Sequence, residues 1–447
     1  MRRARIAHHR PSPGRPVLLG FAALIGVGTV LLLLPISWAG RAPSIIEALF
    51  TATSAACITG LTVVDTATFW SPFGQTVILL LVQVGGIGIM VFASTLTLIV
   101  ARRLSLHSRV NTAADARTLG LDNVNGLVLN IVLTVLVLEA ITGALLFVRF
   151  LTAYDYDAGE AAWLAVFHAV SAFNNAGFAL FSDSLMGFAT DPFIVGPLGL
   201  AIVVGGFGFP VLLQLRREFG TPLHWSMNTK LVLFMSGVLV LAGWALIALV
   251  EWNNPATIGN LPVADRLMIS LFHSVNSRTA GFNLVPVEGF EHETWYVMDI
   301  LMFIGGGPAG TSGGIKVTTF GVLLFILLAE LRGEAAVNIF GKRLSRAVHR
   351  QAITLVVLAA AVVAAGTFAI MAMTDYELDR VLFETTSAFA TTGLSTGITA
   401  DLPELAQGVL IVLMYVGRIG LVTIGTTIAL RERPLLYELP KERPAIG

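Results

Sequence analysis

The chain has 447 residues, of which 55% are hydrophobic and 13% are charged, and its mean hydropathy is +0.80. Soluble globular proteins carry about 25% charged residues, so this composition excludes a soluble protein and indicates one that lies in a lipid bilayer. The net charge is zero, which gives no indication of nucleic-acid binding, and the single cysteine, Cys57, excludes a disulfide framework and a cysteine-based metal site.

Eight segments are apolar over the roughly 20 residues that a membrane-spanning helix needs. We expect spans at 17–38, 73–100, 125–151, 193–215, 230–251, 296–328, 351–373 and 405–430, the sixth of them broken by GGGPAGTSGG. An alternative for the first is a cleaved signal peptide, for which its apolar run is long. Basic residues gather at both ends of the chain and in alternate loops, whereas the loops between them are acidic. This pattern predicts a multi-pass protein of the plasma (inner) membrane with both termini cytoplasmic.

A short pattern recurs after each odd-numbered span. It reads LFTATSAACITGL at 49–61, VFHAVSAFNNAGF at 166–178, LFHSVNSRTAGF at 271–282 and LFETTSAFATTGL at 382–394. The segment before each glycine has about a dozen residues, which as a helix is about 18 Å long and too short to cross a hydrocarbon core of roughly 30 Å. We therefore expect each copy to enter the membrane partway and return.

The four copies predict an all-α membrane protein whose eight transmembrane helices form four repeats of span, pore loop and span, with pseudo-fourfold symmetry around a central pore, as in potassium channels. Non-helical backbone at membrane depth is tolerated where it is packed in protein or lines water. The expected divisions are an N-terminal tail at 1–16, repeat 1 at 17–106, repeat 2 at 107–220, repeat 3 with its broken second span at 221–345, repeat 4 at 346–433 and a C-terminal tail at 434–447.

Each copy ends on one glycine, and these are Gly60, Gly177, Gly281 and Gly393. Glycine adopts backbone angles that other residues resist, so it allows a return strand to turn its carbonyl oxygens toward an axis. Rings of carbonyls that replace the water shell of an ion form potassium filters. Because each copy has one glycine where a strict potassium channel has two, we expect one good potassium site and weaker discrimination against sodium. The alternative is that the four turns only pack.

Polar residues near the glycines have two interpretations each. The hydroxyls of Thr59, Thr279 and Thr392 either assist the ion or cap helix ends. Acidic residues follow the four glycines by five to eight positions and either concentrate cations at the mouth or are solvated loop charges: Asp65, Asp183, Glu288 and Asp401.

A second motif begins 23 to 27 residues after these glycines, as VGGIG at 84–88, VGGFG at 204–208, IGGGP at 304–308 and VGRIG at 416–420. Its middle residue is glycine in three copies and Arg418 in the fourth. An arginine at mid-membrane costs about 2.5–3.5 kcal/mol or more, so we expect Arg418 to be a cation barrier or a gate latch rather than a side chain that snorkels to the surface. The segment 305–316 contains six glycines and a proline and ends on Lys316. It cannot stay helical, and we expect a flexible flap near Arg418 rather than a passive kink.

These motifs resemble those of the Trk/Ktr/HKT superfamily of potassium transporters, over nearly the whole chain and most closely the bacterial Ktr-type membrane subunit. The carrying stretches are TSAACITGLTVVD, FHAVSAFNNAGF, FHSVNSRTAGFN, FETTSAFATTGLSTG, GGGPAGTSGGIKVTTF and YVGRIG. The resemblance implies potassium uptake through a selectivity filter in which backbone carbonyls bind K⁺. Its implied filter residues are Ile58, Thr59, Gly60, Leu61, Asn175, Ala176, Gly177, Phe178, Thr279, Ala280, Gly281, Phe282, Thr391, Thr392, Gly393 and Leu394.

The resemblance also implies a gate in which the loop 305–316 contacts Arg418. The expected gate residues are Gly305, Gly306, Gly307, Gly310, Thr311, Ser312, Gly313, Gly314, Lys316 and Arg418. It implies a homodimer on a cytoplasmic ring of nucleotide-binding regulatory subunits of the KtrA or TrkA kind. No G-x-G-x-x-G follows a predicted strand in this chain, so we expect that partner to be a separate protein and this chain to hold no organic cofactor. Dependence on Na⁺ stays open.

Two other functions compete with a pore. A cation symporter of K⁺ with Na⁺ or H⁺ would use alternating access, but such carriers usually contain inverted repeats, whereas these four share one orientation. An intramembrane serine hydrolase would use Ser312, which lies in a G-x-S-x-G pattern. It would need a histidine at membrane depth, and the next one, His349, lies between Arg346 and Arg350. We therefore expect a transporter and not an enzyme.

Overall fold

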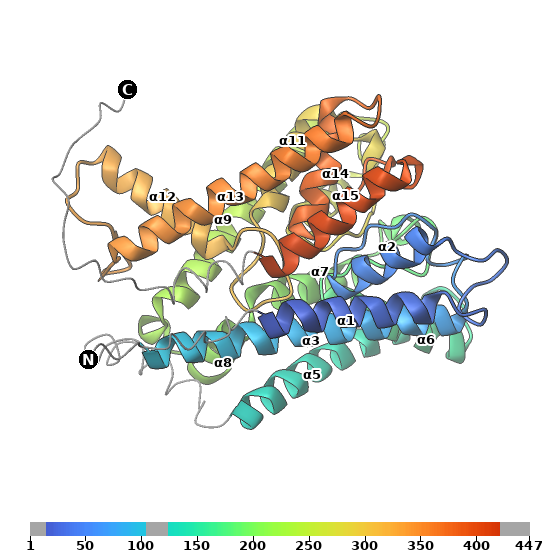
Figure 1. Cartoon of the computed structure of the whole chain (residues 1–447), viewed down its shortest axis with the longest axis horizontal. Helices are drawn as coiled ribbons and strands as arrows, with labels where there is room; N and C mark the ends of the chain where they lie inside the picture. Colours follow the sequence, from blue (N-terminus) through green and yellow to red (C-terminus); the bar gives the residue numbers. More distant parts are fainter. Residues whose placement is uncertain (1–14, 104–123, 421–447) are drawn as a thin grey trace, which may run out of the picture.

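The computed structural model describes residues 15–103 and 124–420 of the chain. The expected terminal tails, the basic loop with Arg109 and Arg117, and the end of the eighth expected span beyond 420 lie outside the described residues. The protein is mostly helical (Figure 1). One antiparallel pair of short strands, β1 (Asn338–Ile339) and β2 (Lys342–Arg343), joins two of the helices.

Three kinds of helix follow one another along the chain. An opening helix precedes each copy of the repeated pattern: α1 (Arg15–Leu32), α5 (Val124–Ala153), α9 (Met227–Glu251) and α13 (Arg346–Met371). Short helices follow them: α2 (Ile45–Ala56), α6 (Ala158–Phe173), α10 (Val263–Asn276) and α14 (Leu378–Ala390). The returning helices are α3 (Pro72–Arg103), α7 (Pro192–Phe207) with α8 (Phe209–Glu218), α11 (His292–Phe303) with α12 (Val317–Leu331), and α15 (Glu404–Tyr415) with the π-helical turn η5 (Val416–Gly420).

The short helices begin where their sequences provide stabilising charges. Each has an acidic residue in its first turn, Glu47, Glu160, Asp265 or Asp379, which favours the positive end of the helix dipole. Ser44 adds a capping box to α2: its hydroxyl accepts a bond from the N–H of Glu47, whose carboxylate accepts one from the N–H of Ser44. Short 3₁₀ turns lie in the connections, as η1 (Met186–Phe188), η2 (Pro222–His224), η3 (Val287–Gly289) and η4 (Thr399–Asp401).

The contacts between helices form a closed sequence. Each short helix contacts the opening helix before it, and each returning helix contacts the short helix of another copy: α3 with α6, α7 with α10, α11 with α14, and α15 with α2. The phenylalanine that opens the repeated pattern is at most 3% exposed in every copy, as Phe50, Phe167, Phe272 and Phe383. Burial of these rings fixes the short helices inside the protein.

The span count differs from the eight segments expected from sequence. Among the described residues, four helices are long and apolar enough to cross a membrane: Pro72–Thr95, Gly126–Ala153, Met227–Glu251 and Arg346–Met371. Pro192–Phe207 and Phe209–Glu218 make a fifth if counted as one broken span. The span expected over 193–215 is broken into α7 and α8, which meet at 101° around Gly208. The expected break in the sixth span is present, between α11 and α12.

Candidate ion pathway

Gly60, Gly177, Gly281 and Gly393 form a closed ring beyond the inner ends of the four short helices. All four have positive φ angles, of 90, 69, 82 and 93°. A Cβ atom added to any of them would lie only 2.9–3.2 Å from the α-carbon of the next glycine, in chain order and from Gly393 back to Gly60. It would also strike the carbonyl oxygen before that neighbour, on Ala176, Ala280, Thr392 or Thr59. Backbone carbonyls from four segments therefore crowd together where only glycine fits.

The residue two positions before each glycine is also in the left-handed region. Ile58, Asn175, Thr279 and Thr391 have φ angles of 58, 58, 75 and 52°. Such angles are unusual outside glycine and asparagine and are least favourable for β-branched residues, which three of these are. Each costs on the order of 1–3 kcal/mol and persists only where surrounding packing holds it. All four residues are at most 1% exposed, so the same strained turn is enforced in every copy.

A polar side chain from each short helix supports the turn that follows. Ser54 Oγ accepts from the N–H of Gly60 at 3.0 Å, and Ser387 Oγ accepts from Gly393 at 3.1 Å. Ser171 Oγ donates to the carbonyl of Phe178 at 2.7 Å. The third copy is one residue shorter between Phe and Gly, and there Asn276 uses its longer side chain: its Oδ1 accepts from the N–H of Phe282 at 2.8 Å and its amide donates to the Phe282 carbonyl.

The other expected filter residues are enclosed beside the ring. Leu61, Ala176, Phe178, Ala280, Phe282 and Leu394 are at most 1% exposed. The hydroxyls of Thr59, Thr279, Thr391 and Thr392 are buried and have no hydrogen-bond partner among the described residues. They therefore do not cap the short helices, which was the alternative explanation for three of them.

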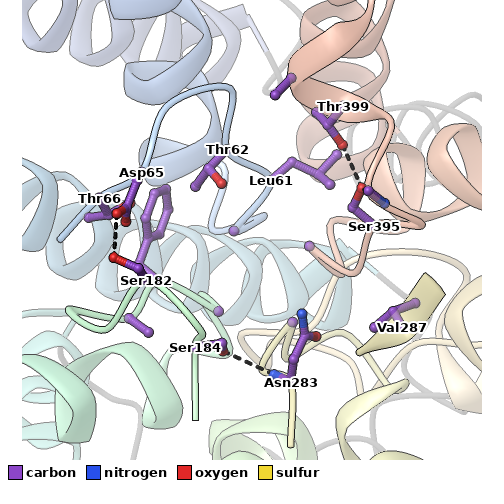
Figure 2. A pocket seen from close by; sticks show the side chains of 18 of the residues that line it. Leu61, Thr62, Asp65, Thr66, Ser182, Ser184, Asn283, Val287, Ser395 and Thr399 are labelled. Atoms are coloured by element: carbon purple, nitrogen blue, oxygen red, sulfur yellow. Dashed lines mark hydrogen bonds between the residues drawn. The ribbon is translucent and has the colours of Figure 1, made fainter. Parts of the chain in front are cut away.

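A cavity of about 380 Å³ opens on one side of the ring and is lined by all four glycines. Figure 2 shows its wall, where Ser182 donates to Asp65 at 2.5 Å and Ser184 accepts from the N–H of Asn283 at 3.0 Å. These bonds connect the first copy to the second and the second to the third. Of the four acids expected near the mouth, Asp65 and Glu288 line this cavity, whereas Asp183 and Asp401 do not.

The loop 305–316 lies on the other side of the ring, against the break between α7 and α8. The N–H of Gly307 donates to the Gly206 carbonyl at 2.7 Å, and the N–H of Phe209 donates to the Ala309 carbonyl at 3.2 Å. The loop is also tied to its own stems, because Gly305 N–H donates to Ile315 O at 2.9 Å. Gly208, with φ 88°, leaves no room for a side chain beside this loop. A sequence signal for this second break is present in GGFGFP at 205–210, where glycines and a proline interrupt the apolar run.

Three basic side chains converge on carbonyls of the loop. Arg418 lies in the π-helical turn, is 2% exposed and donates to the carbonyl of Thr311. Lys316 Nζ donates to Ser312 O at 2.5 Å, so it is not simply a solvated lysine. Arg278, which the sequence motifs do not single out, donates to Gly305 O at 3.1 Å. No carboxylate pairs with any of the three within the part of the chain that the structure describes.

The two asparagines before Gly177 have separate contacts. Asn174 donates to Gln83 Oε1 and Glu139 Oε1, both at 2.9 Å, and so joins α6 to α3 and α5. The amide of Asn175 lies 3.3 Å from Thr311 Oγ1 and 3.2 Å from Ser312 Oγ. Asn175 thus joins the turn of the second copy to the loop. Ser312 contacts this amide and is 1% exposed, which does not fit the serine nucleophile of a hydrolase.

Comparisons with known proteins find relatives along nearly the whole chain. The family model described as TrkH, cation transport protein, matches residues 21–434. The chain is 39% identical to the Ktr system potassium uptake protein B of Bacillus subtilis (95% of this chain, 94% of that protein) and 37% identical to its namesake from Vibrio alginolyticus (97% and 94%). It is 33% identical to the potassium/sodium uptake protein NtpJ of Enterococcus hirae (98% of each).

A solved structure has the same fold. The crystal structure of the potassium transporter TrkH from Vibrio parahaemolyticus matches with a TM-score of 0.73 over 95% of this chain and 86% of that one, at 19% sequence identity. The three relatives are named as uptake proteins and not as enzymes.

Proposed function

Because this chain belongs to the TrkH family of cation transport proteins, we propose that it takes up potassium ions across the plasma membrane. Two of its relatives are named as potassium uptake proteins and a third as a potassium/sodium uptake protein. The observation that carries the proposal is the closed ring of four glycines, in which each α-carbon lies against backbone of the next copy.

The segments 58–61, 175–178, 279–282 and 391–394 are the proposed selectivity filter. They belong to four repeats of span, pore loop and span around one pore, with the boundaries expected from sequence. Three observations support this role: the matching φ angles, the carbonyls crowded at the ring, and the supporting bond from each short helix. A site made of backbone carbonyls replaces the water shell of a cation without a fixed negative charge.

The loop 305–316, Lys316 and Arg418 are the proposed gate. The carbonyl of Thr311 in the loop accepts a hydrogen bond from Nη1 of Arg418, whose Nε and Nη2 have no partner among the described residues. Because a buried guanidinium needs a partner, the bond favours the position in which the loop covers the pathway. Arg418 therefore acts as a latch on the loop and as a positive charge that repels cations beneath the filter.

The same proposal includes the orientation of the protein in the membrane, its assembly and its ion preference. The cavity of about 380 Å³ faces the outside, both termini are cytoplasmic, and the loop is on the cytoplasmic side of the filter. The protein works as a homodimer on separate cytoplasmic nucleotide-binding regulatory subunits, which move the loop. With four single glycines, the filter prefers potassium over sodium but tolerates some sodium.

The test is potassium and sodium flux into proteoliposomes that contain the full chain. Wild type is compared with Gly60→Ser, whose added Cβ would lie 3.0 Å from Gly177 Cα, and with deletion of residues 306–313. The control is Gly237→Ser, because a Cβ at Gly237 in α9 meets nothing within 4 Å. We expect wild type to prefer potassium, Gly60→Ser to reduce that preference and the deletion to raise flux.

The control should leave flux and selectivity as in wild type. If Gly60→Ser and the deletion also leave both unchanged, the repeated turns are packing elements and the pore assignment is wrong. Uptake of potassium against its electrochemical gradient, driven by sodium or protons, would instead favour a symporter.

A further inference from the structure

Arg278 breaks the likeness between the four filter segments. It lies three residues before Gly281, where the other copies have Cys57, Asn174 and Ala390. The third copy is therefore the only one with a cation at this position. It is also the copy whose returning helices, α11 and α12, are separated by the loop 305–316.

The guanidinium of Arg278 is enclosed at the junction of three elements. The residue is 9% exposed, and its Nη2 donates to Gly305 O at 3.1 Å while Nη1 lies 3.5 Å from Ser236 O in α9. Its Nε has no partner among the described residues. Burying a charge without a counter-ion is costly, so the carbonyl at the start of the loop is a main source of its stabilisation.

The packing around Gly305 explains why a cation is needed there. In the other copies the first glycine of the second motif lies against a carbonyl in the last turn of the short helix: Gly85 against Ala56, Gly205 against Phe173, and Gly417 against Phe389. In the third copy Gly305 lies instead against Gly313, within the loop. The direct contact between returning span and short helix is replaced there by the Arg278 bond.

We propose that Arg278 is a positioning residue that couples the gate to the selectivity filter. It precedes Thr279, whose φ of 75° belongs to the strained turn, and it holds the first residue of the loop. When the loop leaves the pathway, Gly305 moves and Arg278 loses its partner, so the third filter segment loses its support on that side. Conversely, loss of the Arg278 bond favours departure of the loop. This inference rests on the proposed pore function.

The experiment compares Arg278→Gln and Arg278→Lys in the full chain. Two readouts are used: the potassium-to-sodium flux ratio in proteoliposomes, and the rate at which a membrane-impermeant thiol reagent labels Ser312→Cys in a Cys57→Ala background. Ser312 is 1% exposed, so labelling reports departure of the loop. The matched control is Arg266→Gln, because Arg266 belongs to α10 and also donates to backbone carbonyls, those of Leu261, Trp252 and Gly259, away from the loop.

Loss of a charged hydrogen bond changes an equilibrium by on the order of tenfold, so we expect Arg278→Gln to raise labelling by about that factor and to lower the flux ratio. Arg278→Lys should bring the labelling rate and the flux ratio partway back to their wild-type values, because the lysine ammonium can still donate to one backbone carbonyl. In the chain without 306–313, Arg278→Gln should change flux little further, since both changes act on the same loop.

The proposal would be overturned if Arg278→Gln had the labelling rate and the flux ratio of wild type. It would also be overturned if Arg278→Gln changed these two quantities no more than Arg266→Gln does. If Arg278→Gln does not yield folded protein, Arg278→Lys decides in the same way, with wild-type labelling as the contrary outcome. A wild type without potassium-preferring flux would instead reject the pore function. The labelling rates would still report whether Arg278 holds the loop.

Discussion

The hydroxyl of Ser54 accepts a hydrogen bond from the backbone N–H of Gly60 at 3.0 Å, and Ser387 has the same relationship to Gly393 at 3.1 Å. Serine and glycine are six residues apart in both copies. The bond satisfies an N–H at a turn that is held at a positive φ angle and is otherwise closed by neighbouring backbone. The geometry of the proposed filter therefore depends on side chains that need not touch the ion.

Ser54→Ala should lower the potassium-to-sodium flux ratio by several-fold while leaving the protein folded. A buried N–H without a partner costs about 1–3 kcal/mol, enough to populate other arrangements of the turn. Ion fluxes in proteoliposomes measure the ratio. Thr53→Val is the control, because the Thr53 hydroxyl is buried on the same helix without a hydrogen-bond partner among the described residues. An unchanged ratio in Ser54→Ala would mean that the turn is held by packing alone.

The four turns could be located from sequence because spacing along a chain repeats when structure repeats. The glycines at 60, 177, 281 and 393 can be aligned from their flanking residues, and the structure brings all four together. The break of the sixth span was also predictable, since glycine and proline oppose helix formation wherever they occur. The filter and gate roles of these residues stay predictions.

Contacts between distant segments were not predictable from one sequence. Whether GGFGFP continues a helix depends on what packs beside Gly208, and that neighbour is the loop residue Pro308, a hundred positions away. Arg278 resembles any polar residue of the third pattern until its guanidinium is placed at Gly305 O. Both misses concern partners that the sequence does not place side by side.

Gly208→Ala should raise potassium flux with little change in selectivity. An added Cβ would lie 3.1 Å from the backbone nitrogen of Gly310 and would strain a φ of 88°. The loop 305–316 would then no longer pack against Gly208, while the filter segments would keep their contacts. The measurement is the same flux assay, at equal amounts of inserted protein. Gly237→Ala serves as control, because its Cβ would meet nothing within 4 Å. A flux equal to wild type in Gly208→Ala would show that the loop does not depend on this contact.

Glu139→Leu should lower thermal stability markedly, whereas Glu139→Gln should lower it less. Glu139 is 6% exposed and accepts bonds from Gln83 and Asn174. Leucine leaves the amide of Gln83 without an acceptor, at a cost of roughly 1–3 kcal/mol, whereas Asn174 keeps its bonds to Gln83 and Val170. Loss of the monodisperse peak after heating in detergent measures the effect. Thr134→Val, at a half-buried position of the same helix, is the control. Equal thermal midpoints for Glu139→Leu and wild type would mean that the amide of Gln83 finds another partner.

Asp191→Asn should make stability less sensitive to acid. Asp191 lies just before α7; burial alone would raise the pKa of its carboxyl, but hydrogen bonds from Arg149, the N–H of Phe193 and Tyr154 hold that pKa below its usual value. A lowered pKa contributes stability that is present above the unfolded value of about 3.9 and is lost as pH falls through the folded value. Thermal midpoints at pH 7 and below pH 4 test this.

Asparagine also caps helices well, so Asp191→Asn removes the negative charge but keeps a side chain that can cap α7. The difference between wild type and Asp191→Asn should shrink as the pH falls, because wild type then loses the same charge. A constant difference across the pH range would contradict the assignment of the stabilisation to the carboxylate.

Glu288→Gln should reduce potassium uptake at low ionic strength and have little effect at high salt. Glu288 is exposed and lines the cavity that is open to all four glycines, so its charge attracts cations to the mouth. Screening shortens the reach of that charge to about 10 Å at 0.1 M salt, so the effect should fade as an inert salt is added. Asp155→Asn, between α5 and α6 and outside the cavity lining, is the control. Uptake that falls equally in both variants, or independently of salt, would favour a solvated loop charge over a role in collecting ions.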